Sequence, residues 1–155
     1  MDLLDTILTN TYTMQDLHHR LRILKLYFET KQFGGKFEFS PEDLAWLNSL
    51  GEDFFSKFTK ENFYNNFLEL EKKISLLIPL IIYLSFEPAK EQIELIGLWI
   101  KKNLTQKLLF EIKIDPGLIG GVALVYKGVY KDYSLRSKIQ EQNETILTEF
   151  KKYIR

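Results

Sequence analysis

Two glycine-containing turns divide residues 108–132 into three short runs, and this arrangement constrains the fold more than any other feature of the sequence. In the first run, 108–114, every second residue is apolar, which is the period of a strand with one buried face. Asp115-Pro116-Gly117 follows, and these three residue types together favour a chain reversal. The pattern therefore predicts a strand that ends in a tight turn.

The double glycine Gly120-Gly121 opens a second alternating run, and Lys127-Gly128 turns the chain into a short third one at 129–132. Glycines at a strand start indicate a bulge or a close approach of two backbones. The alternative interpretation of these glycines is a loop that binds phosphate through its backbone N–H groups. It is disfavoured because the glycines lead into a strand and lack the spacing of a P-loop or a dinucleotide fingerprint.

Short polar residues flank these turns. Asp115 and Asp132 could form a catalytic carboxylate pair, but each stands at a turn or strand end, where aspartate accepts hydrogen bonds from backbone N–H groups. We therefore predict that both cap the backbone. Leu118 and Ile119 are expected to pack beneath the first turn, and Ser134 is expected to N-cap a helix.

The first half of the chain carries only helical patterns. Thr13 and Asp16 resemble a capping box, Ser40-Pro41 is a strong helix start, and a further helix is expected over 59–76. After Thr13, one apolar stripe follows 3-4-3-4 spacing and comprises Met14, Leu17, Leu21, Leu24 and Phe28. The stripe is too short to indicate a coiled coil, so it predicts a helix packed in a bundle.

Beyond residue 76, strand and helix patterns alternate. Residues 80–86 are rich in Ile, Leu and Tyr and predict a strand, and Glu87-Pro88 is expected to begin the next helix. A long helix from Ser134 closes the chain, with a stripe formed by Leu135, Ile139, Ile146, Phe150 and Ile154.

The predicted fold class is α+β. We expect an N-terminal helical bundle over 1–75, then a small mixed α/β sheet domain over 77–133 and a long C-terminal helix over 134–155.

Charge and cysteine content narrow the functional classes. The formal net charge is zero, whereas nucleic-acid binding favours a concentrated basic stripe. The absence of cysteine excludes disulfides and thiolate metal sites. The acidic N-terminus argues against a signal peptide, and the apolar block at 76–86 is short of the ~20 residues of a transmembrane helix. We expect a soluble chain whose link to a membrane passes through a partner.

Few residues suggest chemistry. His18 and His19 are adjacent on a helix and point about 100° apart, so they cannot chelate one metal together and a surface role is expected. The sequence has no Gly-x-Ser-x-Gly nucleophile elbow. Tyrosines beside basic residues could form an RNA-stacking platform at Tyr126, Tyr130, Tyr133, Lys127, Lys131 and Arg136. The preferred alternative is that Tyr126 packs inward and the others form an ordinary wet surface.

The segment from 112 to 136 resembles the signature of the delta subunit of bacterial F-type ATP synthases, called OSCP in mitochondria. The matching positions are Asp115, Pro116, Leu118, Ile119, Gly120, Gly121, Gly128, Asp132, Ser134 and Arg136. The resemblance covers 77–139 best. It departs at the N-terminus, where the family's Tyr-Ala-x-Ala-Leu segment is missing and the helical domain is shorter than in the family.

The resemblance implies a non-catalytic stator subunit without a cofactor or metal, peripheral on the cytoplasmic face of the bacterial plasma membrane. Its partners would be the N-terminal segments of the alpha subunits and the C-terminal helices of the b subunits. Candidate contacts lie on the two stripes, at Met14, Leu17, Leu21, Leu24 and Phe28 and at Ile139, Ile146 and Phe150. The alternative is that both stripes are core.

Two other functional classes compete with the stator role. The first is a free-standing adaptor or RNA-binding α+β module, which would bind RNA in a salt-dependent way. The second is an enzyme, which would show a deep polar pocket with converging titratable groups.

Overall fold

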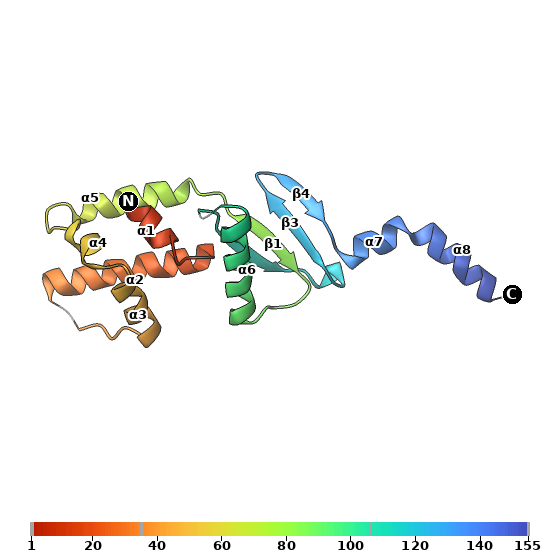
Figure 1. Ribbon diagram of the computed structural model, residues 1–155, viewed down its shortest axis with the longest axis horizontal. Coiled ribbons are helices and arrows are strands. Elements are labelled where there is room, and N and C mark those ends of the chain that lie inside the picture. The colour runs from red at the N-terminus through yellow and green to blue at the C-terminus, as the bar shows by residue number, and fades with distance from the viewer. Residues whose placement is uncertain (1, 35, 106, 155) are drawn as a thin grey trace.

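The molecule is elongated, with a helical bundle, a sheet unit and a projecting C-terminal arm arranged in a row (Figure 1). The computed structural model describes residues 2–34, 36–105 and 107–154. Gly35, expected with Gly34 to end a helix, and Arg155, expected at the end of the terminal helix, lie outside the described residues. The combination of helices with a mixed sheet confirms the α+β class.

Helices make up the bundle, and the sequence signals for the starts of α2 and α3 are confirmed. The bundle consists of α1 (Leu3–Leu8), α2 (Met14–Phe33), α3 (Pro41–Ser49), α4 (Glu52–Ser56) and α5 (Phe63–Ser75). The Thr13 hydroxyl accepts a hydrogen bond from the backbone N–H of Asp16 at 3.0 Å. The Ser40 hydroxyl caps α3 in the same way, by accepting from the N–H of Asp43 at 3.1 Å. Each cap satisfies a donor that the first helical turn leaves unpaired.

Aromatic packing holds the bundle together. The ring of Phe28 on α2 lies 4.4 Å from that of Phe58 and 5.6 Å from that of Phe63, measured between centroids. Phe63 is fully buried and lies 4.8 Å from Phe67 one turn later. Each of these rings removes a large apolar area from water, and Leu, Ile and Met side chains complete the core around them.

The sheet unit is a mixed four-stranded sheet in the order β2-β1-β3-β4. Its elements are β1 (Leu80–Leu84), α6 (Lys90–Asn103), β2 (Phe110–Ile114), β3 (Val122–Tyr126) and β4 (Val129–Asp132). β1 pairs in parallel with β2 and antiparallel with β3, while β3 and β4 form an antiparallel hairpin. The crossover between the parallel strands runs through α6, as parallel pairing requires.

The cores of the bundle and the sheet unit meet at the start of β2. α6 covers one face of the sheet, where Ile100 packs with Ile82 and Phe110. Leu109 points the other way and is buried in the bundle core. Successive residues of an extended chain face opposite sides, so one short segment contributes to both cores.

Three predicted element boundaries are wrong. The helix expected over 59–76 begins only at Phe63, as α5. The first strand ends at Leu84, and Phe86, which was predicted to extend it, is 55% exposed. α6 begins at Lys90 rather than at Glu87-Pro88. The reason is local, because the side-chain carbonyl of Gln92 accepts from the backbone N–H of Ala89 at 2.9 Å and fixes the helix start there.

Replacing Phe63 by alanine tests the aromatic core. Phe63→Ala is expected to lower the free energy of unfolding by about 3–5 kcal/mol, because it leaves a cavity between Phe28 and Phe67. Leu68→Ala on the same helix is the control and is expected to change stability by about 0.5 kcal/mol or less, since Leu68 is exposed. Urea unfolding measures both, and equal effects would contradict the assignment of the core.

Candidate functional site

The part of the chain with the most specific sequence pattern forms the root of the C-terminal arm. The arm consists of α7 (Leu135–Glu141) and α8 (Asn143–Tyr153), and it leaves the sheet directly after β4. β4 is an edge strand of the sheet. Lys127 and Gly128 both have positive φ, at 49° and 79°, so the predicted turn between β3 and β4 is confirmed.

The double glycine lies against the start of the arm. A Cβ on Gly121 would stand 2.5 Å from the carbonyl oxygen of Tyr133, and φ of Gly121 is +79°. The carbonyl of Gly120 accepts from the backbone N–H of Leu135 at 2.9 Å. The predicted close approach of two backbones is therefore confirmed, and it joins the sheet to the first residue of α7.

Both aspartates cap backbone groups, as predicted. Asp115 accepts from the N–H of Gly117 at 2.9 Å, and Asp132 accepts from the N–H of Ser134 at 2.8 Å. Ser134 is fully buried, and its hydroxyl caps α7 by accepting from the N–H of Ser137 at 3.2 Å. Side chains in these roles hold the turn and the helix start.

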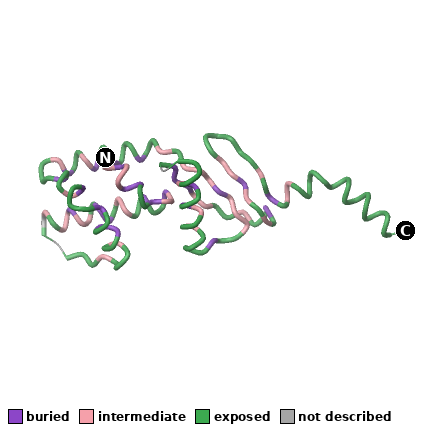
Figure 2. The backbone as a smooth tube through the Cα atoms, in the orientation of Figure 1, coloured by how far each residue is buried: buried purple, intermediate pink, exposed green. Residues whose placement is uncertain are grey.

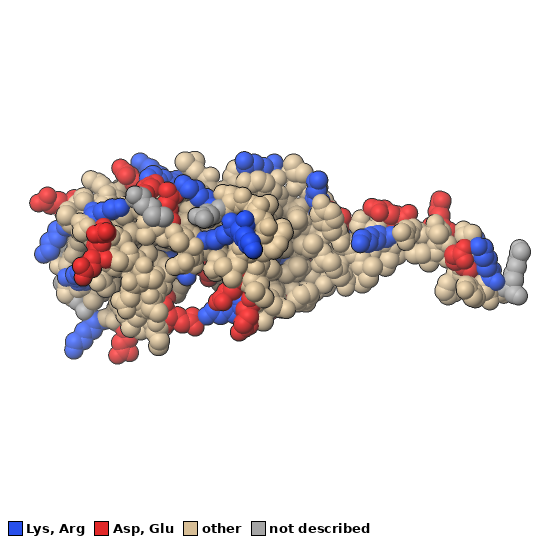
Figure 3. Space-filling view, in the orientation of Figure 1, with Lys and Arg blue, Asp and Glu red and all other residues tan. Residues whose placement is uncertain are grey.

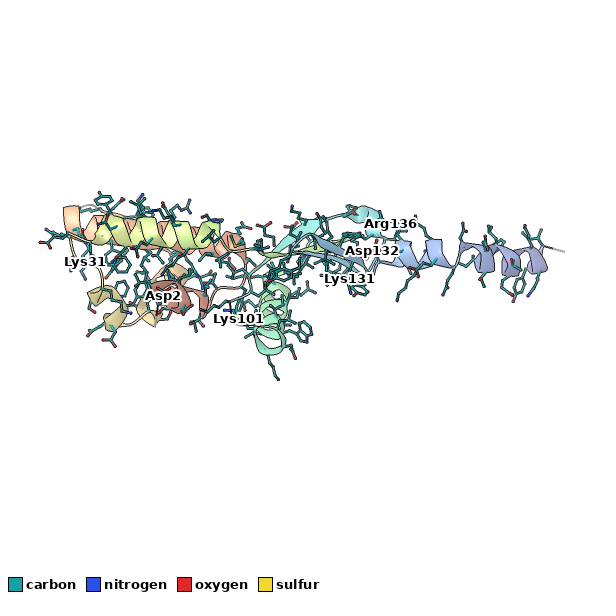
Figure 4. The ribbon with its side chains drawn as sticks, turned by 90° about the horizontal axis from the view of Figure 1, so that it is seen from above. Asp2, Lys31, Lys101, Lys131, Asp132 and Arg136 are labelled. Atoms are coloured by element: carbon teal, nitrogen blue, oxygen red, sulfur yellow. The ribbon has the colours of Figure 1, made fainter. Side chains whose placement is uncertain are left out.

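Asp132 is the most connected residue at the root of the arm (Figure 4). Besides Ser134, it accepts from the Tyr130 hydroxyl at 3.1 Å and lies 3.6 Å from the Arg136 guanidinium. Hydrogen bonds from Ser134, and then those from Tyr130 and the charge of Arg136, hold the pKa of the Asp132 carboxyl below its ordinary value. These contacts stabilise the ionised form of the carboxyl.

The residues after the first turn behave differently from each other. Leu118 is buried, as predicted, but Ile119 is 62% exposed, which corrects the expectation that both pack under the turn. Ile119 has φ +66°, which is unusual for a β-branched residue. The short helical turn at 116–118 ends there, with the Ile119 N–H donating to the carbonyl of Pro116, and the change in backbone direction turns this side chain outward.

The arm presents an apolar stripe to solvent. α7 and α8 contain no buried residue, and the arm is almost wholly exposed in Figure 2. The predicted stripe residues Ile139, Ile146 and Phe150 are 42%, 43% and 65% exposed. Leu147 and Tyr153 are exposed on the same helix and were missed by the sequence analysis, although their spacing to Phe150 and Ile146 gives the signal.

The arm is not the single long helix predicted from Ser134. It breaks at Gln142, where φ is −103° and ψ is 9°. The N–H of Gln142 still donates to Lys138, and its carbonyl still accepts from Ile146. Helical hydrogen bonds therefore continue on both sides, and the break is a kink.

The apolar stripe on α2, unlike the stripe on the arm, faces the interior of the protein. Met14, Leu17, Leu24 and Phe28 are buried in the bundle core, and Leu21 is half-buried against it. Their burial favours the alternative that this stripe is part of the core. Both stripes follow a helical period, and of the two only the stripe on the arm faces solvent.

Of the tyrosines at the hairpin, Tyr126 is more exposed than predicted, and Tyr130 and Tyr133 are exposed as predicted. Tyr126, expected to pack inward, is 37% exposed because it lies at the end of β3, and the ammonium of Lys127 lies 5.3 Å from its ring. Tyr130 and Tyr133 are about half-exposed. Three exposed aromatic rings thus lie at or next to the hairpin, one of them beside a cation, which keeps the RNA-binding alternative open.

A cleft of about 980 Å³ lies between the bundle and the sheet unit, lined by α2, α3, α6 and β2. Its two charged pairs are His19 with Asp43 at 2.8 Å and Lys90 with Glu42 at 2.7 Å. Among the described residues, no three His, Asp or Glu side chains form a group that could hold a metal ion. His19 contacts Asp43 through Nε2 and Arg22 through Nδ1, so both of its ring nitrogens have partners from the protein.

Within the described ranges, no helix combines the length and apolarity needed to cross a bilayer.

Comparison with known proteins finds similar sequences. A family model described as ATP synthase delta (OSCP) subunit matches residues 59–146, which is more than half of the chain. The chain is also similar to a protein from Fervidobacterium nodosum described as ATP synthase subunit delta, with 28% identity over 71 residues. This match covers 46% of the chain and 39% of the relative, so the alignment spans less than half of either protein.

Alanine at the double glycine tests the close approach. Gly121→Ala is expected to lower the free energy of unfolding by roughly 2–5 kcal/mol, because it adds a clash with Tyr133 to the strain of positive φ. Gly128→Ala, at the same φ but in open space, is the control and is expected to lose only about 1–2 kcal/mol. Thermal unfolding distinguishes them, and equal losses would contradict the argument.

Asp132 predicts a pH dependence of stability. Because its pKa is lower in the folded chain than the ordinary 3.8, its contribution is present above that pH and is lost as the pH falls through the folded value. Asp132→Asn is expected to be less stable than the wild type at pH 6, with the difference shrinking at pH values near 3. Urea unfolding at both pH values measures it, and a constant difference would refute the assignment.

Proposed function

The chain belongs to the ATP synthase delta (OSCP) subunit family, and on that premise we propose that it is a stator subunit of a rotary F-type ATP synthase. In this role it links the F1 catalytic head to the peripheral stalk formed by the b subunits. The C-terminal part holds the C-terminal helices of the b subunits, and the bundle holds the N-terminal segments of the alpha subunits. The protein itself performs no catalysis.

The observation that carries this proposal is the apolar stripe of the arm. Its exposed residues lie on helices that project from the sheet, where a second helix can pack alongside them. Such a row of apolar side chains at helical spacing is how an amphipathic helix engages a partner. A contiguous exposed apolar surface of this kind marks an interaction site in a soluble protein.

The charges of the arm suit a protein partner. Its charged side chains have both signs, as Figure 3 shows for the face in view. Lys152 pairs with Glu149 at 2.6 Å on α8, so part of the charge is already neutralised. A mixed polar rim around an apolar centre is the usual composition of a protein–protein interface.

The mechanical role sets a requirement on affinity. A proton that crosses a potential of ~100 mV releases roughly 2.3 kcal/mol, and several such steps are stored for each ATP. A nanomolar contact corresponds to roughly −12 kcal/mol, so a clamp in this range resists the torque between head and rotor. Full burial of one large apolar side chain contributes about 1.5–3 kcal/mol, so a stripe of several residues can supply much of this energy.

Because the α2 stripe is packed in the core, the proposed contact with the alpha subunits involves other residues. Tyr64 and Leu68 lie one turn apart on α5 and are both more than half-exposed. Residues at i and i+4 form one surface of a helix, so this pair offers an apolar site for a short helical segment. We assign the docking of the alpha N-terminal segments to this face.

The proposed location follows from the complex. The protein lies on the cytoplasmic face of the bacterial plasma membrane and reaches the membrane only through the b subunits. An RNA-binding or adaptor module is the second candidate, favoured by the exposed tyrosines of the hairpin. It predicts RNA affinity that falls steeply with salt and no complex with F1.

Reconstitution tests the stator role. Membrane vesicles stripped of this protein are expected to leak protons through the synthase without making ATP, and adding the protein back is expected to restore coupling. Pull-down with purified alpha and b subunits is expected to recover both. Full coupling without the protein would rule out the role, and recovery of RNA instead of alpha and b would favour the second candidate.

Charge insertion on the arm tests the contact with the b subunits. Ile146→Asp and Phe150→Asp are each expected to weaken binding of a peptide from the C-terminal helix of b at least tenfold, about 1.4 kcal/mol, because a carboxylate would be buried in an apolar contact. Thr148→Asp adds the same charge on the opposite face of α8 and is the control. Calorimetric titration measures all three, and wild-type affinity in the two stripe variants would contradict the contact.

A further inference from the structure

The segment between α1 and α2 is held by residues from both the bundle and the sheet unit. The backbone N–H of Phe110 donates to the carbonyl of Tyr12 at 3.1 Å, and Thr13 forms an isolated parallel bridge with Phe110. This segment therefore adds a short stretch to the edge of the sheet beside β2. It is covalently part of the bundle and hydrogen-bonded to the sheet.

Lys101 reaches this segment from α6. Its ammonium donates to the carbonyl oxygens of Leu8 and Thr9, with the latter bond at 2.7 Å, and lies 5.0 Å from the ring centre of Tyr12. The carbonyls at the end of α1 lack partners within their own helix. A lysine from another part of the chain thus supplies the cation that favours a helix C-terminus (Figure 4).

Gly97 makes room for the same contact. A Cβ at Gly97 would lie 2.4 Å from the ring of Tyr12, so only glycine allows the ring to rest against α6. The ring packs with the core of the sheet unit. Gly97 and Lys101 are four residues apart and therefore lie on one face of α6.

The bundle holds the segment from its other side. The guanidinium of Arg20 donates to the carbonyl of Asn10 at 2.5 Å and to the hydroxyl of Thr11 at 2.8 Å. Thr11 is fully buried, and its own hydroxyl donates to the carbonyl of Ile7 at 2.5 Å. The segment is thus fixed to the bundle, and Lys101 joins this fixed piece to α6.

The pKa shifts of Lys101 and Arg20 agree with the partial burial of both side chains. Burial, together with the positive charge of Arg20, lowers the pKa of Lys101 to about 8. Burial also lowers the pKa of Arg20 from its ordinary value, opposed by the charges of Asp16, Tyr12 and Asp43. A pKa shift caused by desolvation indicates that the charged group is at least partly enclosed by protein.

Other contacts between the two units are weaker or act as a pivot. The pair of Lys90 and Glu42 crosses the mouth of the cleft, but both side chains are more than 60% exposed, so the pair contributes little. Leu109 is buried in the bundle core and keeps the units attached. Leu77 also packs against that core, and Lys107 pairs with Asp5 of α1 at 2.6 Å. These contacts hold the sheet unit at residues 77 and 107–109, and α6 is held to the bundle elsewhere, through Lys101.

We propose that Lys101 and Gly97 of α6, with the segment from Leu8 to Tyr12, form a latch that locks the bundle and the sheet unit into one rigid body. Without the latch, the two units rock about Leu109 while each remains folded. The inference goes beyond the stator role and does not depend on it, because it concerns the free protein.

Distance measurements between two spin labels test the latch in the full chain. The natural sequence has no cysteine, so Glu71→Cys on α5 and Lys131→Cys on β4, both exposed, give a unique labelled pair. Electron–electron double resonance is expected to give one narrow distance distribution in the otherwise unchanged chain. Lys101→Met, which keeps the aliphatic stem but removes the donors, is expected to lose this single narrow peak.

Lys102→Met is the matched control, because the neighbouring lysine is exposed and lies off the latch face of α6. It is expected to keep the narrow distribution. Gly97→Ala is expected to broaden it by displacing Tyr12, with Lys101 intact. Circular dichroism checks that each variant is folded. A narrow distribution in folded Lys101→Met, or equal broadening in Lys102→Met, would overturn the proposal, and if Lys101→Met does not fold, a narrow distribution in Gly97→Ala overturns it.

Discussion

The contact between Gly121 and the carbonyl of Tyr133 determines where the arm leaves the sheet. No side chain fits between these two backbones, and the adjacent hydrogen bond from Leu135 to Gly120 fixes the first residue of α7. No residue of α7 or α8 is buried, so side-chain packing contributes little to the direction of the arm. The proposed stalk contact is therefore positioned by backbone geometry, which only glycine permits at this place.

Local chemistry was predictable from the sequence. The alternation in β2 and β3, the reversal at Lys127-Gly128 and the caps by Asp132 and Ser134 each depend on a few neighbouring residues. Such features carry their own energetic preference, because turn and cap residues satisfy backbone groups within three or four positions. The same locality explains why the family signature in this segment was recognisable in the sequence.

The tertiary contacts of each helix and strand were not predictable from the sequence. The stripes on α2 and on the arm have similar spacing, yet Phe28 meets a shell of aromatic rings while Phe150 meets solvent. Apolar residues at helical spacing indicate that one face of a helix favours burial. The spacing does not indicate whether that face packs against the same chain or against a partner protein. Likewise, nothing in the alternation of β2 indicates that Leu109 belongs to the bundle core, and the positive φ of Ile119 follows from the geometry of the turn before it.

The uncovered arm has a consequence for protein turnover in the cell. A copy that has not found its partner carries an exposed apolar tail from Ile139 to Tyr153, the kind of surface that chaperones and proteases engage. The proposed docking would hide that tail, so survival of the polypeptide would be coupled to docking. Quality control would then remove surplus copies, and the abundance of the protein would follow the supply of the helix that covers the arm.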